Sequence, residues 1–191
     1  MIKFLLFLAL VGSSALASPS YLTVKIDGPI GEETRNEVLA LILKVGTTPN
    51  QIWIQIDTPG GRADIMEDMY NTIMKLRDKG HTVNCLIKKA YSAGFAIAAA
   101  CSQRFAYKSS TLMWHHGWFS YIGPLDVPTT REILESLEKD QEQWDTLVRA
   151  GFKASDEAFH YMRDNTLILT AEEINMVSPG YLNIIKEKGK K

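Results

Sequence analysis

The sequence predicts an α/β fold, because strand-like and helix-like segments alternate along the first two-thirds of the chain. The strand-like segments are short runs rich in β-branched and other apolar residues, bounded by glycine, proline or polar turns. The helix-like segments carry apolar residues at helical spacing, and several of them end at a glycine. Strands that are joined through helices pair in parallel, so we expect one mainly parallel sheet with helices packed on it.

The three main strands are expected in the first half of the chain. The run 21–26 alternates and is β-branched, 52–56 is mostly apolar and therefore buried, and 82–87 is rich in β-formers. Shorter strands are expected at 104–107, 112–114 and 181–185. Helices are expected at 32–45, 62–79, 95–100, 129–150 and 154–162.

The helix expected at 129–150 has the strongest signals. Thr129 and Glu132 form a capping box at its start, and Gly151 ends it. One face of this helix is apolar, and it comprises Ile133, Leu137, Trp144 and Val148.

Composition indicates one domain without a nucleic-acid partner. The chain has 191 residues, of which 46% are hydrophobic, which suits a single well-packed core. The formal net charge is -1, so no broad basic field is available to attract nucleic acid.

The first residues have the pattern of a secretory signal peptide. Lys3 supplies the positive start, 4–11 is a short apolar run, and Ala15-Leu16-Ala17 fits the small-x-small cleavage pattern. We therefore expect a signal peptide at 1–17 and a single mature domain at 18–191, exported to the periplasm or secreted. The apolar run is too short to span a bilayer, and no later segment reaches the required length, so no stable membrane anchor is expected. An uncleaved anchor is the alternative.

The two cysteines flank one strand-to-helix junction. Cys85 lies in the strand 82–87, and Cys101 ends the helix that follows it. They could approach each other if that helix folds back along the strand. Two buried free thiols are nevertheless the more ordinary outcome, and that is the expectation.

Ser92 lies where the strand beginning at Thr82 turns into the small-residue helix 95–100. A helix N-terminus places free N–H groups and the positive end of the helix dipole beside the serine hydroxyl. That environment stabilises negative charge developing next to Ser92, as acyl transfer at a serine requires. The alternative interpretation is a core helix with Ser92 as its N-cap.

A second junction, Pro59-Gly60-Gly61, joins the strand 52–56 to the following helix. Glycine pairs at such turns allow a ligand to approach the main chain. On adjacent parallel strands, the two junctions would bring the N–H groups of Gly61 and Ala93 to the same sheet edge, where they would form an oxyanion hole. The alternative is a plain turn.

Two adjacent histidines, His115 and His116, follow the short strand 112–114. A histidine in this position is a candidate general base. Two neighbouring residues on an extended chain face different ways, so only one is expected to reach Ser92. The chain has four histidines and neither an HExxH nor a CxxC motif, so no metal site is expected.

Four short motifs follow one another along the chain: IDTPGG, then AYSAG, then MWHHG, then RDN followed by LTAEE. Together they resemble the proteolytic subunit family of the Clp protease (ClpP), from about Tyr21 to the C-terminal region. The resemblance implies a spiral of ββα units, as in crotonases, and an ATP-dependent serine peptidase in stacked rings. It also implies that the helix 129–150 is a handle through which two rings stack.

Position by position, the resemblance implies a site of five residues. Ser92 looks like the nucleophile and His115 like the base, while Gly61 and Ala93 look like the oxyanion N–H donors. Asp164, from the RDN motif, looks like the acid that orients the histidine. These roles agree with the chemistry of a Ser-His-Asp triad, in which a neutral imidazole takes the serine proton and a carboxylate steadies the imidazolium.

The chain also departs from the family pattern. Two extra residues within 166–168 separate Asp164 from the LTAEE stretch, and Asp126 is the reserve candidate for the acid. His116-Gly117 replaces the usual Gln-Pro, and Asp57 stands where asparagine is common. The signal peptide and the apparent lack of the segment that forms axial loops argue against an ATPase partner.

We therefore expect an exported, ATP-independent serine endopeptidase that hydrolyses peptides or unstructured protein segments and forms a homo-oligomer, as a ring or stacked rings, without cofactors. Three alternatives stay open at this point. The first is a Ser-Lys peptidase like signal peptide peptidase A, with Lys88, Lys89 or Lys108 as the base. The second is a non-catalytic binding or assembly module on the same fold, and the third is a crotonase-type acyl-CoA enzyme.

Overall fold

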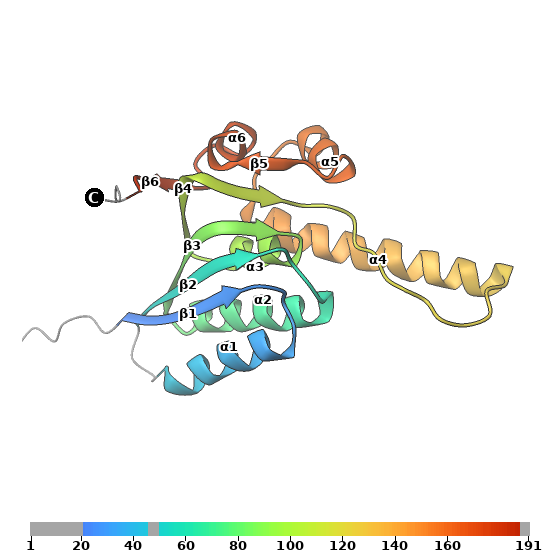
Figure 1. The fold of residues 1–191 in the computed structure, drawn as a ribbon, viewed down its shortest axis with the longest axis horizontal. Coiled ribbons are helices and arrows are strands. Elements are labelled where there is room, and N and C mark those ends of the chain that lie inside the picture. Colours follow the sequence, from blue (N-terminus) through green and yellow to red (C-terminus); the bar gives the residue numbers. More distant parts are fainter. Residues whose placement is uncertain (1–20, 46–49, 188–191) are drawn as a thin grey trace, which may run out of the picture.

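Four parallel strands, in the order β1-β2-β3-β4, form the main part of the sheet (Figure 1). The computed structural model describes residues 21–45 and 50–187, so the expected signal peptide at 1–17 lies outside the described residues. The strands are β1 (Tyr21–Asp27), β2 (Gln51–Thr58), β3 (Thr82–Tyr91), β4 (Gln103–Met113), β5 (Ile168–Thr170) and β6 (Asn183–Ile185). The helices are α1 (Glu32–Lys44), α2 (Ala63–Asp78), α3 (Ala93–Ala100), α4 (Val127–Gly151), α5 (Asp156–Asp164) and α6 (Ala171–Val177).

The strand order explains where the core lies. Each strand from β1 to β4 pairs with the next one along the chain, and a right-handed crossover between such strands returns the helix to the same face each time. Along β2, the side chains of Ile52, Ile54 and Ile56 are buried while the alternate residues are more exposed. The expected α/β fold, a spiral of strand and helix units with a projecting helix, is confirmed.

The structure corrects several expected boundaries. The strands expected at 104–107 and 112–114 are parts of one long strand, β4. The helix expected from Thr129 begins at Val127, because the side chain of Asp126, not that of Thr129, caps it by accepting a hydrogen bond from the Thr129 N–H. The LTAEE stretch forms β5 and α6, two elements for which no signal was recognised in the sequence.

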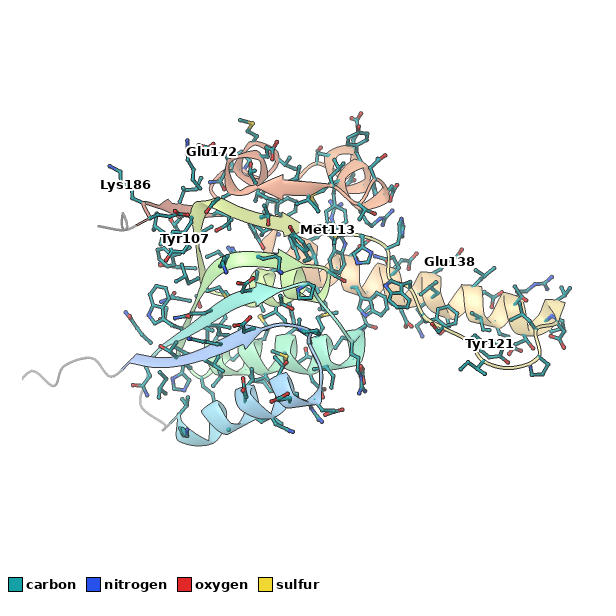
Figure 2. All side chains as sticks on the ribbon, viewed as in Figure 1. Tyr107, Met113, Tyr121, Glu138, Glu172 and Lys186 are labelled. Carbon is teal, nitrogen blue, oxygen red and sulfur yellow. A yellow bond between two sulfur atoms is a disulfide. The ribbon has the colours of Figure 1, made fainter. Side chains whose placement is uncertain are left out.

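Helix α4 and the loop before it project away from the sheet as an arm (Figure 1). Met113 ends β4 near the middle of the molecule, whereas Tyr121 lies on the arm (Figure 2). The arm exposes several large apolar side chains, and exposed apolar surface of this kind often marks an interaction site. They are Trp118, Phe119, Tyr121, Ile122, Leu125, Val127 and Leu134. Among the described residues, we find no helix with the length and apolarity that crossing a membrane requires.

The expectation of two buried free thiols is wrong, because Cys85 and Cys101 form a disulfide. Helix α3 folds back along β3, and this brings the two Cα atoms to 5.9 Å from each other. Both side chains are buried in the core. The disulfide therefore closes a loop that contains Ser92 and the whole of α3.

We expect reduction of this disulfide to lower the thermal stability of the protein. A loop with a sequence separation of 16 residues corresponds to about 3 kcal/mol of stabilisation through the entropy of the unfolded chain. For a chain of this size, that loss lowers Tm by about 6–12 °C. Calorimetry measures the Tm of the oxidised protein and of the reduced protein, whose free thiols are verified by alkylation. The double variant Cys85→Ala/Cys101→Ala serves as a second form without the disulfide. Equal Tm values for the oxidised and reduced protein would contradict the expectation.

Candidate active site

Ser92 occupies the tight junction between β3 and α3 with a strained backbone. Its φ of 52° and ψ of -121° place a non-glycine residue at positive φ, a conformation that is concentrated at functional sites. Its N–H donates to the carbonyl oxygen of Met113 at 2.8 Å, which ties the junction to the end of β4. The Ser92 side chain makes no capping hydrogen bond with α3. The interpretation of Ser92 as a simple N-cap therefore loses its main support.

Gly60 is packed directly against Ser92. A Cβ atom at Gly60 would lie 2.6 Å from the Cβ of Ser92, and the Gly60 φ of +100° is itself unfavourable for other residues. The N–H of Gly60 donates to the Thr58 hydroxyl at 3.0 Å, which fixes the turn. Glycine at position 60 is therefore needed to let this turn approach the serine.

Gly61 and Ala93, the predicted oxyanion donors, lie at the two strand-to-helix junctions, after β2 and after β3. The backbone of Ile30 forms hydrogen bonds with both chain neighbours of Gly61. The Ile30 N–H donates to the Gly60 carbonyl, and the Ile30 carbonyl accepts from the Arg62 N–H. This pattern leaves the Gly61 N–H facing away from Ile30. The Ala93 N–H belongs to the first turn of α3, where amides have no partner within the helix. Among the backbone hydrogen bonds that the described residues form outside helices and strands, none is donated by the N–H of Gly61 or of Ala93.

One cavity of about 630 Å³ brings four of the five predicted site residues together. Ser92, His115, Gly61 and Ala93 all line it. Its other walls are largely apolar, and they include Ile30, Met66, Trp114, Trp118 and Trp144. A cavity of this size accommodates several side chains of an extended peptide or a small-molecule ligand.

His115 is half-buried in this cavity wall. Burial lowers the pKa of His115 below its ordinary value, a hydrogen bond with the backbone of His116 opposes this shift, and the charge of the neighbouring His116 adds to it. The imidazole is thus held in its neutral form near neutral pH. A neutral imidazole is the form that accepts a proton from a serine hydroxyl.

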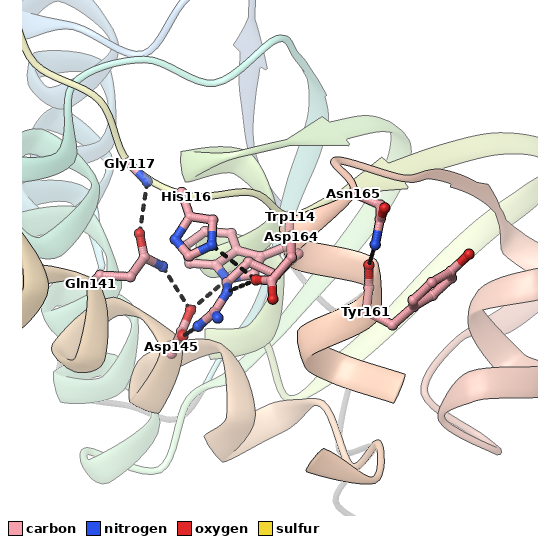
Figure 3. Close-up of polar contacts among 9 residues, drawn as sticks. Trp114, His116, Gly117, Gln141, Asp145, Tyr161, Asp164 and Asn165 are labelled. Atoms are coloured by element: carbon pink, nitrogen blue, oxygen red, sulfur yellow. Dashed lines mark hydrogen bonds and ion pairs between the residues drawn. The ribbon is translucent and has the colours of Figure 1, made fainter. Parts of the chain in front are cut away.

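Asp164, the fifth predicted residue, is bonded to the other histidine. Its Oδ1 atom accepts a hydrogen bond from His116 Nε2 at 2.9 Å and one from Arg163 Nε at 2.8 Å (Figure 3). These two partners, Arg163 foremost, hold the pKa of Asp164 below its usual value. The expected contact between Asp164 and His115 is not among the hydrogen bonds of the described residues. The structure therefore brings the serine and one histidine together, and the carboxylate and the other histidine together.

A network of hydrogen bonds and an ion pair with α4 anchors the segment 114–117, which carries both histidines (Figure 3). The buried Asp145 carboxylate on α4 accepts through Oδ1 from Trp114 Nε1 and from Gln141 Nε2, each at 2.8 Å. Gln141 accepts in turn from the N–H of Gly117 at 2.7 Å. The other oxygen of Asp145 pairs with Arg163. Helix α4 thus fixes both ends of the segment 114–117.

Sequence reasoning missed this network and the contact beside it. Trp144 donates through Nε1 to Glu67 at 2.6 Å, and a Cβ atom at Gly117 would lie 2.2 Å from the Trp144 ring. The sequence did offer one signal for this network. Asp145 is a charged residue that directly follows Trp144, a member of the apolar face of the helix. Gln141 lies one helical turn before Asp145, but the other two partners, Arg163 and Trp114, are 18 and 31 residues away in sequence, and no local pattern indicates them.

The other candidate residues lie elsewhere. Asp126, the reserve acid, caps the outer end of α4 and does not line the cavity. Lys88 and Lys89 pair with Asp57, and Lys108 pairs with Glu172. None of these lysines lines the cavity that contains Ser92. Within 21–45 and 50–187, we find no group of histidine, cysteine and acidic residues that could hold a metal ion.

Ser92, His115, Gly61 and Ala93 line one cavity beside a mainly parallel α/β sheet, and serine hydrolases use a serine, a histidine and main-chain amides of this kind. The family comparison narrows this class. A family model described as Clp protease matches residues 18–177. The chain therefore belongs to the Clp protease family. A search among curated proteins found no match.

Proposed function

We propose that this protein is a serine endopeptidase that uses Ser92 as nucleophile and His115 as general base. One observation carries the proposal: Ser92, whose side chain makes no capping hydrogen bond, lines the same cavity as His115, Gly61 and Ala93. Membership of the Clp protease family supports it independently.

The chemistry follows from these positions. His115 takes the proton of the Ser92 hydroxyl as the oxygen attacks a peptide carbonyl, and later gives it to the leaving amine. The amides of Gly61 and Ala93 stabilise the oxyanion of the tetrahedral intermediate. Water then hydrolyses the acyl-enzyme with His115 again as base. Asp164 is the carboxylate that steadies the imidazolium in the reactive state.

The substrates we propose are peptides and unstructured protein segments. An extended chain can lie along an open cavity bordered by Trp114, Trp118 and Trp144, whereas a folded domain presents no free strand to it. We propose that the protein acts without an ATPase. The disulfide between Cys85 and Cys101 supports an exported location, because disulfides persist in oxidising compartments.

We propose a homo-oligomer, in the form of a ring or stacked rings. The support is family membership together with the projecting arm, whose apolar side chains a second copy would cover. Sedimentation velocity of the purified protein tests it, and a protein that remains a monomer at micromolar concentration would exclude it.

The pH dependence of kcat/KM for peptide hydrolysis tests the identity of the base. A general base acts in its deprotonated form, so activity falls as the pH drops through its pKa. Because burial lowers the pKa of His115, we expect the acid limb to inflect below the ordinary histidine value of about 6.5. A Ser-Lys dyad would instead give an alkaline inflection. A fluorophosphonate probe should label Ser92 over the same pH range, and failure to label would favour a non-catalytic module.

A further inference from the structure

The hydrogen bond between His116 and Asp164 has a consequence for the resting state of the site. Asp164 Oδ1 already accepts from His116 Nε2 and Arg163 Nε, at 2.9 and 2.8 Å. His115 has no hydrogen bond to this carboxylate within the described part of the chain. The proposed base therefore lines the cavity that contains Ser92 without a hydrogen bond to the carboxylate that would orient its ring.

The two histidines compete for one partner. Consecutive residues of an extended segment direct their side chains to different sides, so His115 faces the Ser92 cavity while His116 faces a neighbouring pocket beside α4. A carboxylate placed on the side of His116 cannot at the same time orient the ring of His115 through the same oxygen. Transfer of Asp164 from one ring to the other is thus a local switch.

We propose that the His116–Asp164 hydrogen bond is a latch, which keeps the resting peptidase less active by withholding Asp164 from His115. The inference rests on the proposed function, because only a catalytic histidine needs an orienting carboxylate. His116 acts in it as a positioning residue, since it acts on the reaction through Asp164. The latch opens when Asp164 exchanges His116 for His115.

The surroundings make such an exchange feasible. The side chains of His116 and Asp164 are 53% and 49% exposed, so water can solvate either group when the bond breaks. Arg163 is far less exposed, at 13%, and pairs with the buried Asp145 on α4. Arg163 therefore anchors Asp164 beside the segment that carries both histidines, and the proposed exchange requires the carboxylate to turn from one ring to the other.

The strength of the latch sets the size of the expected effect. Exposed ion pairs contribute little, and the usual range corresponds to about a two- to five-fold change in an equilibrium. A latch of this strength holds the resting state but yields to the binding of a substrate that orders the cavity. We therefore expect its removal to increase kcat/KM by about two- to five-fold.

The experiment compares His116→Ala, which removes the latch donor, with wild type and with His116→Ala/Asp164→Asn. His160→Ala is the matched control, because His160 is also an exposed histidine and lies on the same helix as Asp164. Two quantities are measured in each protein: kcat/KM for a fluorogenic peptide, and the pKa of His115 from an NMR titration of the histidine ring protons. The His115 signal is assigned from the spectrum of His115→Gln.

We expect His116→Ala to raise kcat/KM and also to raise the pKa of His115, because a carboxylate at its ring favours the protonated form. Both changes should disappear in the Asp164→Asn background and be absent in His160→Ala. An unchanged His115 pKa in His116→Ala would overturn the latch. Loss of turnover in His116→Ala would overturn it too, because His116 would then be the base. Absence of peptidase activity in every protein would refute the proposed function alone, and the titration would still decide the latch.

Discussion

Ser92→Ala is expected to abolish peptide hydrolysis, with a fall in kcat of roughly a million-fold, as when the nucleophile of another serine peptidase is removed. In the proposed mechanism the oxygen of this hydroxyl forms the acyl-enzyme, and the described residues that line the cavity include no other serine, threonine or tyrosine that could replace it. The measurement is turnover of a fluorogenic peptide by protein purified under conditions that exclude host peptidases. Active-site titration with a fluorophosphonate gives the fraction of competent wild-type sites.

The substitution should leave the fold intact. The Ser92 side chain makes no capping bond, and alanine carries the same backbone strain at a φ of 52° as serine does. We therefore expect an unchanged Tm. Ser109→Ala is a matched control, because Ser109 is exposed on β4 and its hydroxyl donates to the exposed Glu187 carboxylate. Full turnover by Ser92→Ala would remove Ser92 from the role of nucleophile, whereas Ser109→Ala should keep the turnover of the wild type.

The positions of Ser92 and Gly61 could be predicted because they depend on topology. Both residues follow strands of one parallel sheet, and adjacent parallel strands end at the same edge. A sequence that sets the order of strands and helices therefore also sets which junctions meet. The glycine at 60 and the small residues of α3 were visible as local signals of close packing.

The pairing of Asp164 could not be predicted from the sequence. It depends on which way two consecutive side chains point after β4 has ended, and no periodicity specifies direction there. It also depends on Arg163, which is held by Asp145 from a helix far away in sequence. The disulfide was missed for a similar reason, since it depends on the angle at which α3 folds back along β3.

His115→Ala is expected to reduce turnover about as strongly as Ser92→Ala, by roughly a million-fold, because nucleophile and base act as one unit. Without the imidazole, the described lining of the cavity offers only a weak base in place of His115. That base is the carboxylate of Asp64, which is already paired with Arg62. Steady-state peptide hydrolysis and the rate of fluorophosphonate labelling both report this loss. His116→Ala, in contrast, keeps the base and should remain at least as active as wild type.

Chemical rescue separates a loss of the base from a loss of structure. His115→Ala leaves ring-sized space in the wall of a cavity of about 630 Å³, which free imidazole can enter. Added imidazole should therefore restore part of the turnover of His115→Ala, and it should do nothing for Ser92→Ala, which lacks the attacking oxygen. The reverse pattern, in which His115→Ala retains activity while His116→Ala needs imidazole, would assign the base to His116. Its existing bond to Asp164 would then be the orienting contact of the triad.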